Sequence, residues 1–173
     1  NPKVAIETLE KELENINHPY TKSFIHSTLG ILNLKLNNLN DSKEEFQSAL
    51  VIISFYGIFQ MEPGLCFYLA QIYEKYQNLN LAKYYYERAN QSANELIKQN
   101  FPYNGDRAKA ILGYINFIKK YPHIKGLPLE SEDLSFCIDL KMDEIRNIFH
   151  YHFLNRLIEL NGTIRKASKQ IDL

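Results

Sequence analysis

The sequence predicts an all-α protein that consists mainly of paired helices repeated along the chain. Apolar residues recur three, four and seven positions apart over long stretches, as they do on the buried face of a helix. Turn-forming residues separate these stretches at regular intervals. A length of 173 residues allows one or two small domains, each with a buried core.

Two segments, residues 23–54 and 63–94, share one pattern of small and aromatic residues. Each has a leucine followed by a small residue, and from that small residue another follows at 12 positions, an aromatic at 16 and an alanine at 19. These residues are Leu29, Gly30, Ser42, Phe46 and Ala49 in the first segment and Leu69, Ala70, Ala82, Tyr86 and Ala89 in the second. Because small residues let two helices approach closely, the pattern predicts two antiparallel helices in each unit.

This pattern resembles the tetratricopeptide repeat over about residues 20–95. The resemblance implies an α-α superhelix of stacked helix pairs, which we expect to span residues 1–125. The sequence departs from the family early in the first helix, where His26 and Cys66 replace a large aromatic residue. The two units are also 40 residues apart, whereas the family spacing is about 34. Residues 55–62 therefore either extend a helix or insert a loop.

The remaining helices of this domain follow from periodicity and turn signals. An initial helix around Ile6, Leu9 and Leu13 is expected to be the second helix of an earlier unit. Turns at 37–41 and 77–80 separate the helices of each unit, and Asp41 with Glu44 predicts a helix start. A helix over 106–121 is expected to close the domain, because prolines and glycine follow it; residues 125–132 are the expected linker.

In the tetratricopeptide family the first helix of each unit lines a concave groove. The resemblance carries this role to Ser27, Ile31, Leu34 and Lys35 in the first unit and to Phe67, Gln71, Glu74 and Lys75 in the second. The set mixes apolar and polar residues with few cations, so it predicts no carboxylate clamp. It implies a protein or peptide partner, or equally a face that packs on another domain of the full protein.

Tyrosines crowd the second unit. Tyr73 and Tyr86 fit the repeat core, with their hydroxyls between helices. The full set is larger than we expect this core to hold; it comprises Tyr68, Tyr73, Tyr76, Tyr84, Tyr85 and Tyr86.

The last part of the chain carries a different pattern. Residues 142–160 predict a long helix with apolar residues on more than one stripe, and Asn161-Gly162 predicts its end. A short helix containing Ala167 and Ser168 follows. This arrangement resembles the C-terminal Fis-type helix-turn-helix domain of bacterial transcription regulators. The resemblance implies that residues 126–173 are a linker and a truncated Fis-type segment, which ends before the recognition helix.

The Fis-type resemblance also implies two sets of functional residues. Paired long helices form a homodimer in that family, which here points to Phe149, His152, Phe153 and Leu157. The first short helix crosses the DNA backbone, which points to phosphate contacts from Arg165, Lys166 and Lys169. An ordinary solvated helix face is the alternative interpretation of these three cations.

Other classes of function find little support in the sequence. Lys and Arg together number 20, as do Asp and Glu, so the chain has no overall basic field for nucleic acid. Cys66 and Cys137 show no metal-ligand or nucleophile pattern, and His150 and His152 point to different sides of a helix. We expect no enzyme activity, no cofactor and no metal. No stretch has the ~20 apolar residues of a membrane span. The two cysteines form no disulfide framework, which is typical of a reducing compartment, so a cytoplasmic location is expected.

Together these patterns predict the partner-docking and dimerising portion of a bacterial DNA-binding transcription regulator. The alternative is a helical-repeat scaffold for protein–protein interaction with no role on DNA. The residues that follow Leu173 in the gene distinguish the two, because only a regulator requires a recognition helix there.

Overall fold

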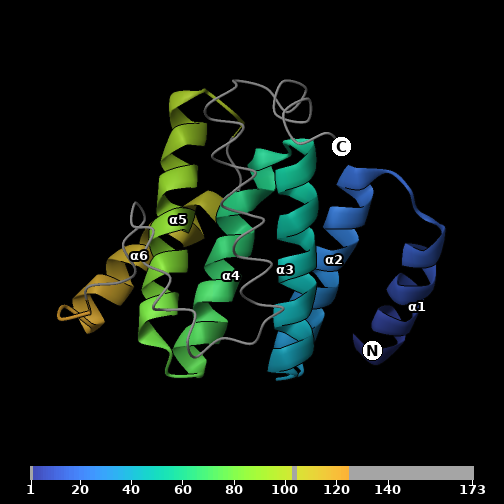
Figure 1. The fold of residues 1–173 in the computed structure, drawn as a ribbon, viewed down its shortest axis with the longest axis horizontal. Helices are drawn as coiled ribbons and strands as arrows, with labels where there is room; N and C mark the ends of the chain where they lie inside the picture. Colours follow the sequence, from blue (N-terminus) through green and yellow to red (C-terminus); the bar gives the residue numbers. More distant parts are fainter. Residues whose placement is uncertain (1, 103–104, 125–173) are drawn as a thin grey trace, which may run out of the picture.

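The computed structural model describes residues 2–102 and 105–124, and this part of the chain is helical throughout, joined by short turns. Its elements are α1 (Pro2–Asn15), α2 (Pro19–Lys35), α3 (Leu39–Tyr56), the 3-10 turn η1 (Phe59–Met61), α4 (Glu62–Lys75), α5 (Leu79–Lys98) and α6 (Gly105–Lys120) (Figure 1). The all-α prediction is therefore confirmed for these residues. The predicted linker and Fis-type segment, with the proposed dimer and DNA contacts, lie outside the described residues.

Helices α2 and α3 form one antiparallel hairpin, and α4 and α5 form another (Figure 1). Both turns use the same geometry. Asn37 and Gln77 have φ of 62° and 60°, and the next amide in each turn donates to a carbonyl five residues back, from Asn38 to Asn33 at 2.9 Å and from Asn78 to Tyr73 at 3.0 Å. This is the Schellman arrangement, which caps the carbonyls of the preceding helix.

The predicted turns are thus confirmed, but the predicted start of α3 is wrong. The helix begins at Leu39 with Asn38 as its N-cap residue, so Asp41 lies inside the first turn. There its carboxylate lies at the positive end of the helix dipole, which stabilises it without a capping bond.

The sequence left open whether a longer helix or an inserted loop accounts for the 40-residue spacing between the two units. The structure has both. Helix α3 continues to Tyr56, and Gly57 ends it with φ of 70°, a left-handed conformation that glycine adopts without strain. The η1 turn then leads into α4.

The closest approach within the first hairpin is at Gly30. A Cβ atom at this position would lie 2.7 Å from Cε1 of Phe46, so only glycine fits unless the ring moves. The Ser42 hydroxyl donates to the Gly30 carbonyl at 2.7 Å, which satisfies a polar group at the same contact. Phe46 also stacks on Tyr68 of α4, with ring centroids 5.1 Å apart, and so joins the two hairpins.

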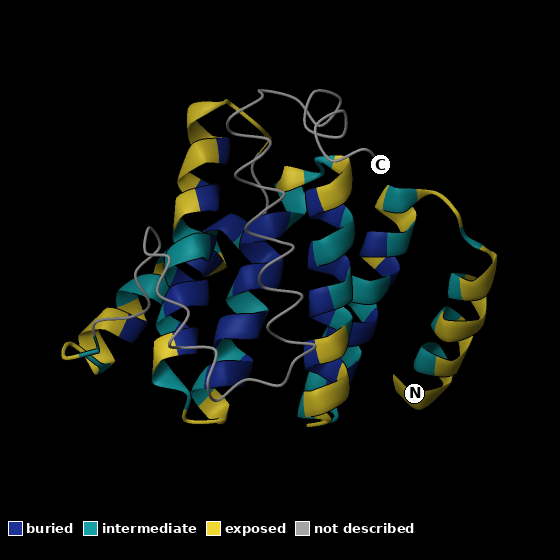
Figure 2. Ribbon diagram, in the orientation of Figure 1, coloured by how far each residue is buried: buried dark blue, intermediate teal, exposed yellow. Residues whose placement is uncertain are grey.

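The tyrosines of the second hairpin are mostly core residues, contrary to the sequence expectation. Tyr73, Tyr84, Tyr85 and Tyr86 are all buried, whereas Tyr76 is exposed. Helix α5 lies between α4 and α6 (Figure 1), so it buries more than one face. Figure 2 shows the buried residues concentrated in the central helices.

These buried phenols make the stability of the protein sensitive to alkali. Burial raises the pKa of Tyr84 and of Tyr86 above the ordinary value of 10.0. Because the pKa values are raised in the folded state, the stabilisation is fully present below pH 10.0 and is lost as the pH rises above it. We expect the melting temperature to fall steeply above this pH, and to fall less steeply in Tyr84→Phe. Thermal unfolding monitored by circular dichroism across this range tests the expectation; equal slopes in the two proteins would contradict it.

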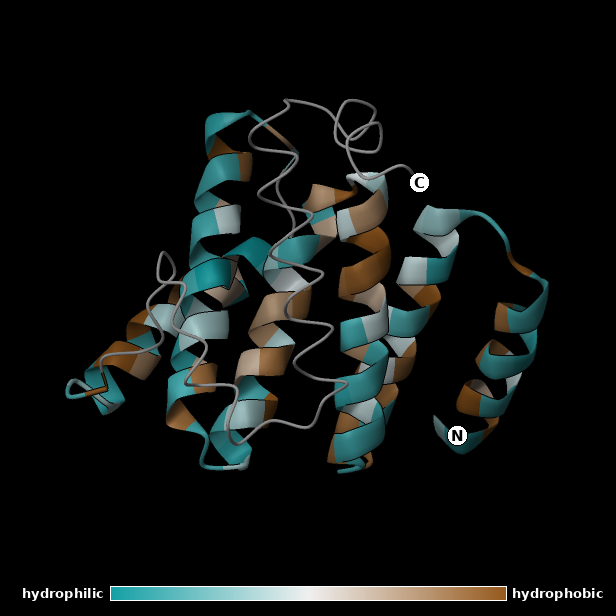
Figure 3. Ribbon diagram, viewed as in Figure 1, coloured by the Kyte–Doolittle hydropathy of each residue, from teal (hydrophilic) through white to brown (hydrophobic). Residues whose placement is uncertain are grey.

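Helices α1 and α6 lie at the two ends of the described structure (Figure 1). Helix α1 has no fully buried residue, and its apolar residues Ile6, Leu9 and Leu13 are half-buried. Helix α6 matches the expected closing helix and buries Ala110 and Phe117. The hydropathy of the helices alternates along their length (Figure 3). Within the described ranges, none of the helices is both long enough and apolar enough to cross a membrane.

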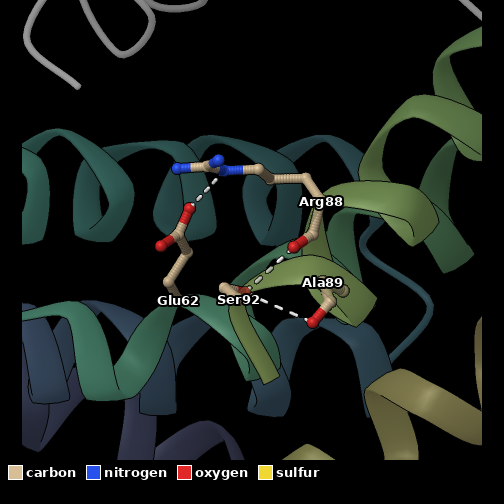
Figure 4. A network of polar contacts seen from close by, with 4 residues as sticks. All are labelled: Glu62, Arg88, Ala89 and Ser92. Atoms are coloured by element: carbon tan, nitrogen blue, oxygen red, sulfur yellow. Dashed lines mark hydrogen bonds and ion pairs between the residues drawn. The ribbon is translucent and has the colours of Figure 1, made fainter. Parts of the chain in front are cut away.

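A buried ion pair joins the start of α4 to the middle of α5. Arg88 Nε donates to Glu62 Oε1 at 2.6 Å, and the side chains are only 17% and 5% exposed. Nearby, the Ser92 hydroxyl donates to the carbonyl of Arg88 at 2.9 Å (Figure 4). The pair holds together the second hairpin at the end opposite its turn.

Candidate partner-binding groove

A groove of about 450 Å³ opens where α2, α4 and the end of α6 meet. Its lining residues are Leu34 from α2, Gln71, Glu74, Lys75 and Gln77 from α4 and the turn after it, and Lys120 and Tyr121 from the end of α6. Leu34 supplies apolar surface and the other residues supply hydrogen-bonding groups. A groove of this kind suits an extended chain with both apolar and polar side chains.

The Glu74 carboxylate is the central charged group of the groove. Its Oε1 lies 2.8 Å from Lys120 Nζ, and its Oε2 accepts a hydrogen bond from the Tyr86 hydroxyl at 3.1 Å. Burial raises the pKa of Tyr86, and the negative charge of Glu74 raises it further. Tyr86 therefore stays a neutral donor, and Glu74 is held in place from both sides.

Lys120 links the groove to the closing helix. Two hydrogen bonds raise the pKa of Lys120. The bond to Glu74 has the larger effect, and the bond to Tyr121 has the smaller one. The ammonium also lies 4.8 Å from the centre of the Tyr121 ring. Since Lys120 is exposed, a ligand with a carboxylate can compete with Glu74 for it.

The structure brings together four of the eight residues that the repeat pattern assigned to a groove: Leu34, Gln71, Glu74 and Lys75. The other four lie elsewhere. Ile31 packs against the core, Ser27 is half-buried and Lys35 is exposed at the end of α2.

Phe67 is covered by the closing helix and does not line the groove. Its ring packs edge-to-face on Tyr68 and Tyr86, with centroids 5.4 and 6.1 Å away. A Cβ atom at Gly113 of α6 would lie 2.6 Å from Cε2 of Phe67. Helix α6 therefore covers α4 at Phe67, and the groove lies beside this contact.

Sequence reasoning missed three lining residues, namely Gln77, Lys120 and Tyr121. Gln77 belongs to the turn that was predicted, but its backbone conformation was not. Lys120 and Tyr121 stand at the end of the predicted closing helix, and only the packing of α6 against α4 brings them to Glu74.

Other features of the described residues do not suggest a second binding site, a metal site or a reactive cysteine. A second hollow of about 520 Å³ lies over α2 and α3, and Lys22 supplies its only charged side chain. In the described ranges, no three side chains of His, Cys, Asp or Glu gather closely enough to hold a metal ion. Cys66 is completely buried in the hydrophobic core, as a small apolar residue would be.

Neither a family model, nor a curated protein, nor a solved structure matches this chain.

Proposed function

We propose that this protein is the partner-docking and dimerising part of a cytoplasmic bacterial transcription regulator. The groove between α2, α4 and α6 carries the docking part of the proposal, because four of its residues are those that a tetratricopeptide-like superhelix would present to a ligand. Its occupant is a protein or peptide segment. The DNA-binding part rests on the Fis-type resemblance of residues 126–173, in which Phe149, Phe153 and Leu157 pair two copies and Arg165, Lys166 and Lys169 contact phosphates.

The docking role predicts that filling the groove weakens peptide binding. Gln71→Trp places a large ring among the lining residues, so we expect it to weaken a bound peptide by roughly tenfold or more, the effect of about 1.4 kcal/mol. Peptides selected from a displayed random library on the intact chain provide the ligand, and fluorescence anisotropy measures their affinity. Gln91→Trp is the matched control, because Gln91 is exposed on α5 and does not line the groove. Equal affinities in both variants would show that peptides bind elsewhere.

The regulator role predicts that DNA binding requires the residues that follow Leu173. Three cations per chain supply few phosphate contacts, and each contributes a slope of about −0.9 to the salt dependence of binding. We therefore expect weak, non-specific binding by residues 1–173 and tight binding by a chain extended past Leu173. Fluorescence anisotropy with palindromic duplexes from the protein's own operon region compares the two. Sequence-selective binding by the shorter chain would show that the recognition element has been misplaced.

A scaffold with no role on DNA is the second candidate, and the same groove favours it equally. It predicts that the extended chain fails to bind any duplex at low salt while groove peptides still bind. These two experiments separate the docking role, which both candidates share, from the DNA-binding role, which belongs to the regulator alone.

A further inference from the structure

The charged side chains of the groove between α2, α4 and α6 determine which kind of segment it can bind. Of its lining residues, Lys75 and Lys120 are basic, and Glu74 is the only acidic one. Both lysines are exposed, so their ammonium groups can reach a bound segment.

Both carboxylate oxygens of Glu74 already have partners. Oε1 lies 2.8 Å from Lys120 Nζ, and Oε2 accepts a hydrogen bond from the Tyr86 hydroxyl at 3.1 Å. Tyr86 is only 4% exposed, and its raised pKa keeps the hydroxyl protonated as a donor at neutral pH. A basic ligand would therefore have to displace Lys120 from Glu74, and it would also be repelled by Lys75.

An acidic ligand does not have to break this arrangement. The side chain of Lys120 is 62% exposed, whereas that of Glu74 is 22% exposed, so the ammonium group has room for another carboxylate on its solvent side. An ammonium group has three donors. Lys120 can therefore bind a ligand carboxylate and keep its contact with Glu74.

The helix ends beside the groove do not reverse its charge. Helix α2 ends at Lys35, α4 at Lys75 and α6 at Lys120, and the negative ends of three helix dipoles would by themselves favour a cation. However, α3 and α5 begin four residues after α2 and α4 end, and their positive ends largely offset this effect. The lysines in the last turns of α2, α4 and α6 therefore decide the sign of the charge that a ligand meets.

The uncharged residues of the groove suit an extended segment. Gln71, Glu74 and Lys75 are three and four positions apart, so they share one face of α4. The amides of Gln71 and Gln77 each offer donors and an acceptor, which match the peptide groups of an extended chain. The half-buried Leu34 adds an apolar surface beside them.

On the basis of the proposed docking role, we infer that the groove selects an acidic segment of a partner protein, in which an aliphatic residue stands beside an aspartate or a glutamate. The acidic side chain pairs with Lys75 and Lys120. The aliphatic side chain lies on Leu34, and the two glutamines bond the main chain of the segment. Opposite charges of this kind give specificity and speed association.

Selection from a displayed random peptide library on the 173-residue chain tests the inference. The wild type and Gln71→Trp are screened in parallel, and peptides recovered on the wild type alone depend on the groove. We expect these peptides to be enriched in aspartate and glutamate and depleted in lysine and arginine, relative to the starting library. A screen without any groove-dependent peptide would refute the docking role itself. Groove-dependent peptides that are neutral or basic would refute only the acidic preference.

Charge reversal supplies the second measurement. We expect Lys75→Glu to weaken the most enriched acidic peptide by roughly tenfold in fluorescence anisotropy, and to tighten binding of the same peptide with lysine at its acidic positions. An unfolded variant cannot produce that gain. Lys120→Gln should also weaken the acidic peptide, because its amide can still donate to Glu74 but carries no charge.

Lys98→Glu is the matched control for charge reversal. It changes the net charge by the same amount at an exposed residue of α5 that does not line the groove, so it should bind both peptides as the wild type does. Equal affinities of Lys75→Glu and Lys98→Glu for the acidic peptide would overturn the inference, even if Gln71→Trp had shown that the peptide occupies the groove.

Discussion

Replacing Gly30 with leucine will lower the melting temperature of the protein markedly. Even a Cβ atom at this position would lie 2.7 to 2.9 Å from three atoms of the Phe46 ring, and a leucine adds three more carbons. Phe46 cannot move aside, because it is completely buried and stacks on Tyr68 of the next hairpin. Overpacking of this kind costs about 1–3 kcal/mol, and we expect the upper end of that range. Thermal unfolding monitored by circular dichroism gives the melting temperature, and chemical denaturation gives the free energy of unfolding.

Two companion variants make the Gly30 result specific. Ala82→Leu should destabilise the second hairpin in the same way, because Ala82 is also completely buried. Gly105→Ala is the matched glycine control, since no atom lies within 4 Å of a Cβ there, and it should be neutral. Wild-type melting of both Gly30→Leu and Ala82→Leu would mean that the helix pairs do not pack in the register described here.

Removing Arg88 from its ion pair is the second change with a large expected effect. Arg88→Met leaves Glu62 as a carboxylate that is only 5% exposed and has lost a partner at 2.6 Å. Breaking a buried ion pair on one side typically costs about 3–5 kcal/mol, and we expect about 3 kcal/mol because the arginine is partly exposed. Urea unfolding at neutral pH measures this loss.

Two further variants distinguish the contribution of the ion pair to stability from that of side-chain packing: a double variant of the buried pair and a single variant of an exposed pair. Glu62→Gln with Arg88→Met should recover part of the stability lost by Arg88→Met alone, because the carboxylate that has lost its arginine partner is no longer charged. Lys109→Met breaks an exposed pair with Asp106, whose side chains are 50% and 45% exposed, and should cost at most about 1 kcal/mol. Strictly additive effects of the two changes at the buried pair would refute a direct interaction.

The parts of the fold that depend on local chemistry could be predicted from the sequence. The small residues Gly30 and Ala82 predicted close contacts between helices, and the asparagines before α3 and α5 predicted the turns. The start of α3 was misjudged because the Schellman turn at Asn37 places the N-cap at Asn38, three residues earlier than the predicted N-cap at Asp41. Local capping signals do not reveal how tightly the preceding helix is closed.

The groove was only half predictable, and the reason is tertiary packing. Positions on α2 and α4 follow from repeat spacing, but Phe67 leaves the groove because Gly113 lets α6 pack on its ring. The same packing brings Lys120 to Glu74, 46 positions apart in the chain. The burial of the tyrosines was missed for a related reason, since a helix with neighbours on more than one side has more core positions than an amphipathic pattern suggests.

The three consecutive tyrosines of α5 fix its rotation about its own axis. Tyr85 stacks on Tyr73 of α4 at 5.4 Å between centroids, whereas Tyr86 meets Phe117 of α6 at 5.0 Å. Successive side chains of a helix point about 100° apart, so any turn of α5 that improves one contact breaks the other. Rotation of α5 about its own axis is therefore opposed from two sides, by the contact of Tyr85 with α4 and by that of Tyr86 with α6.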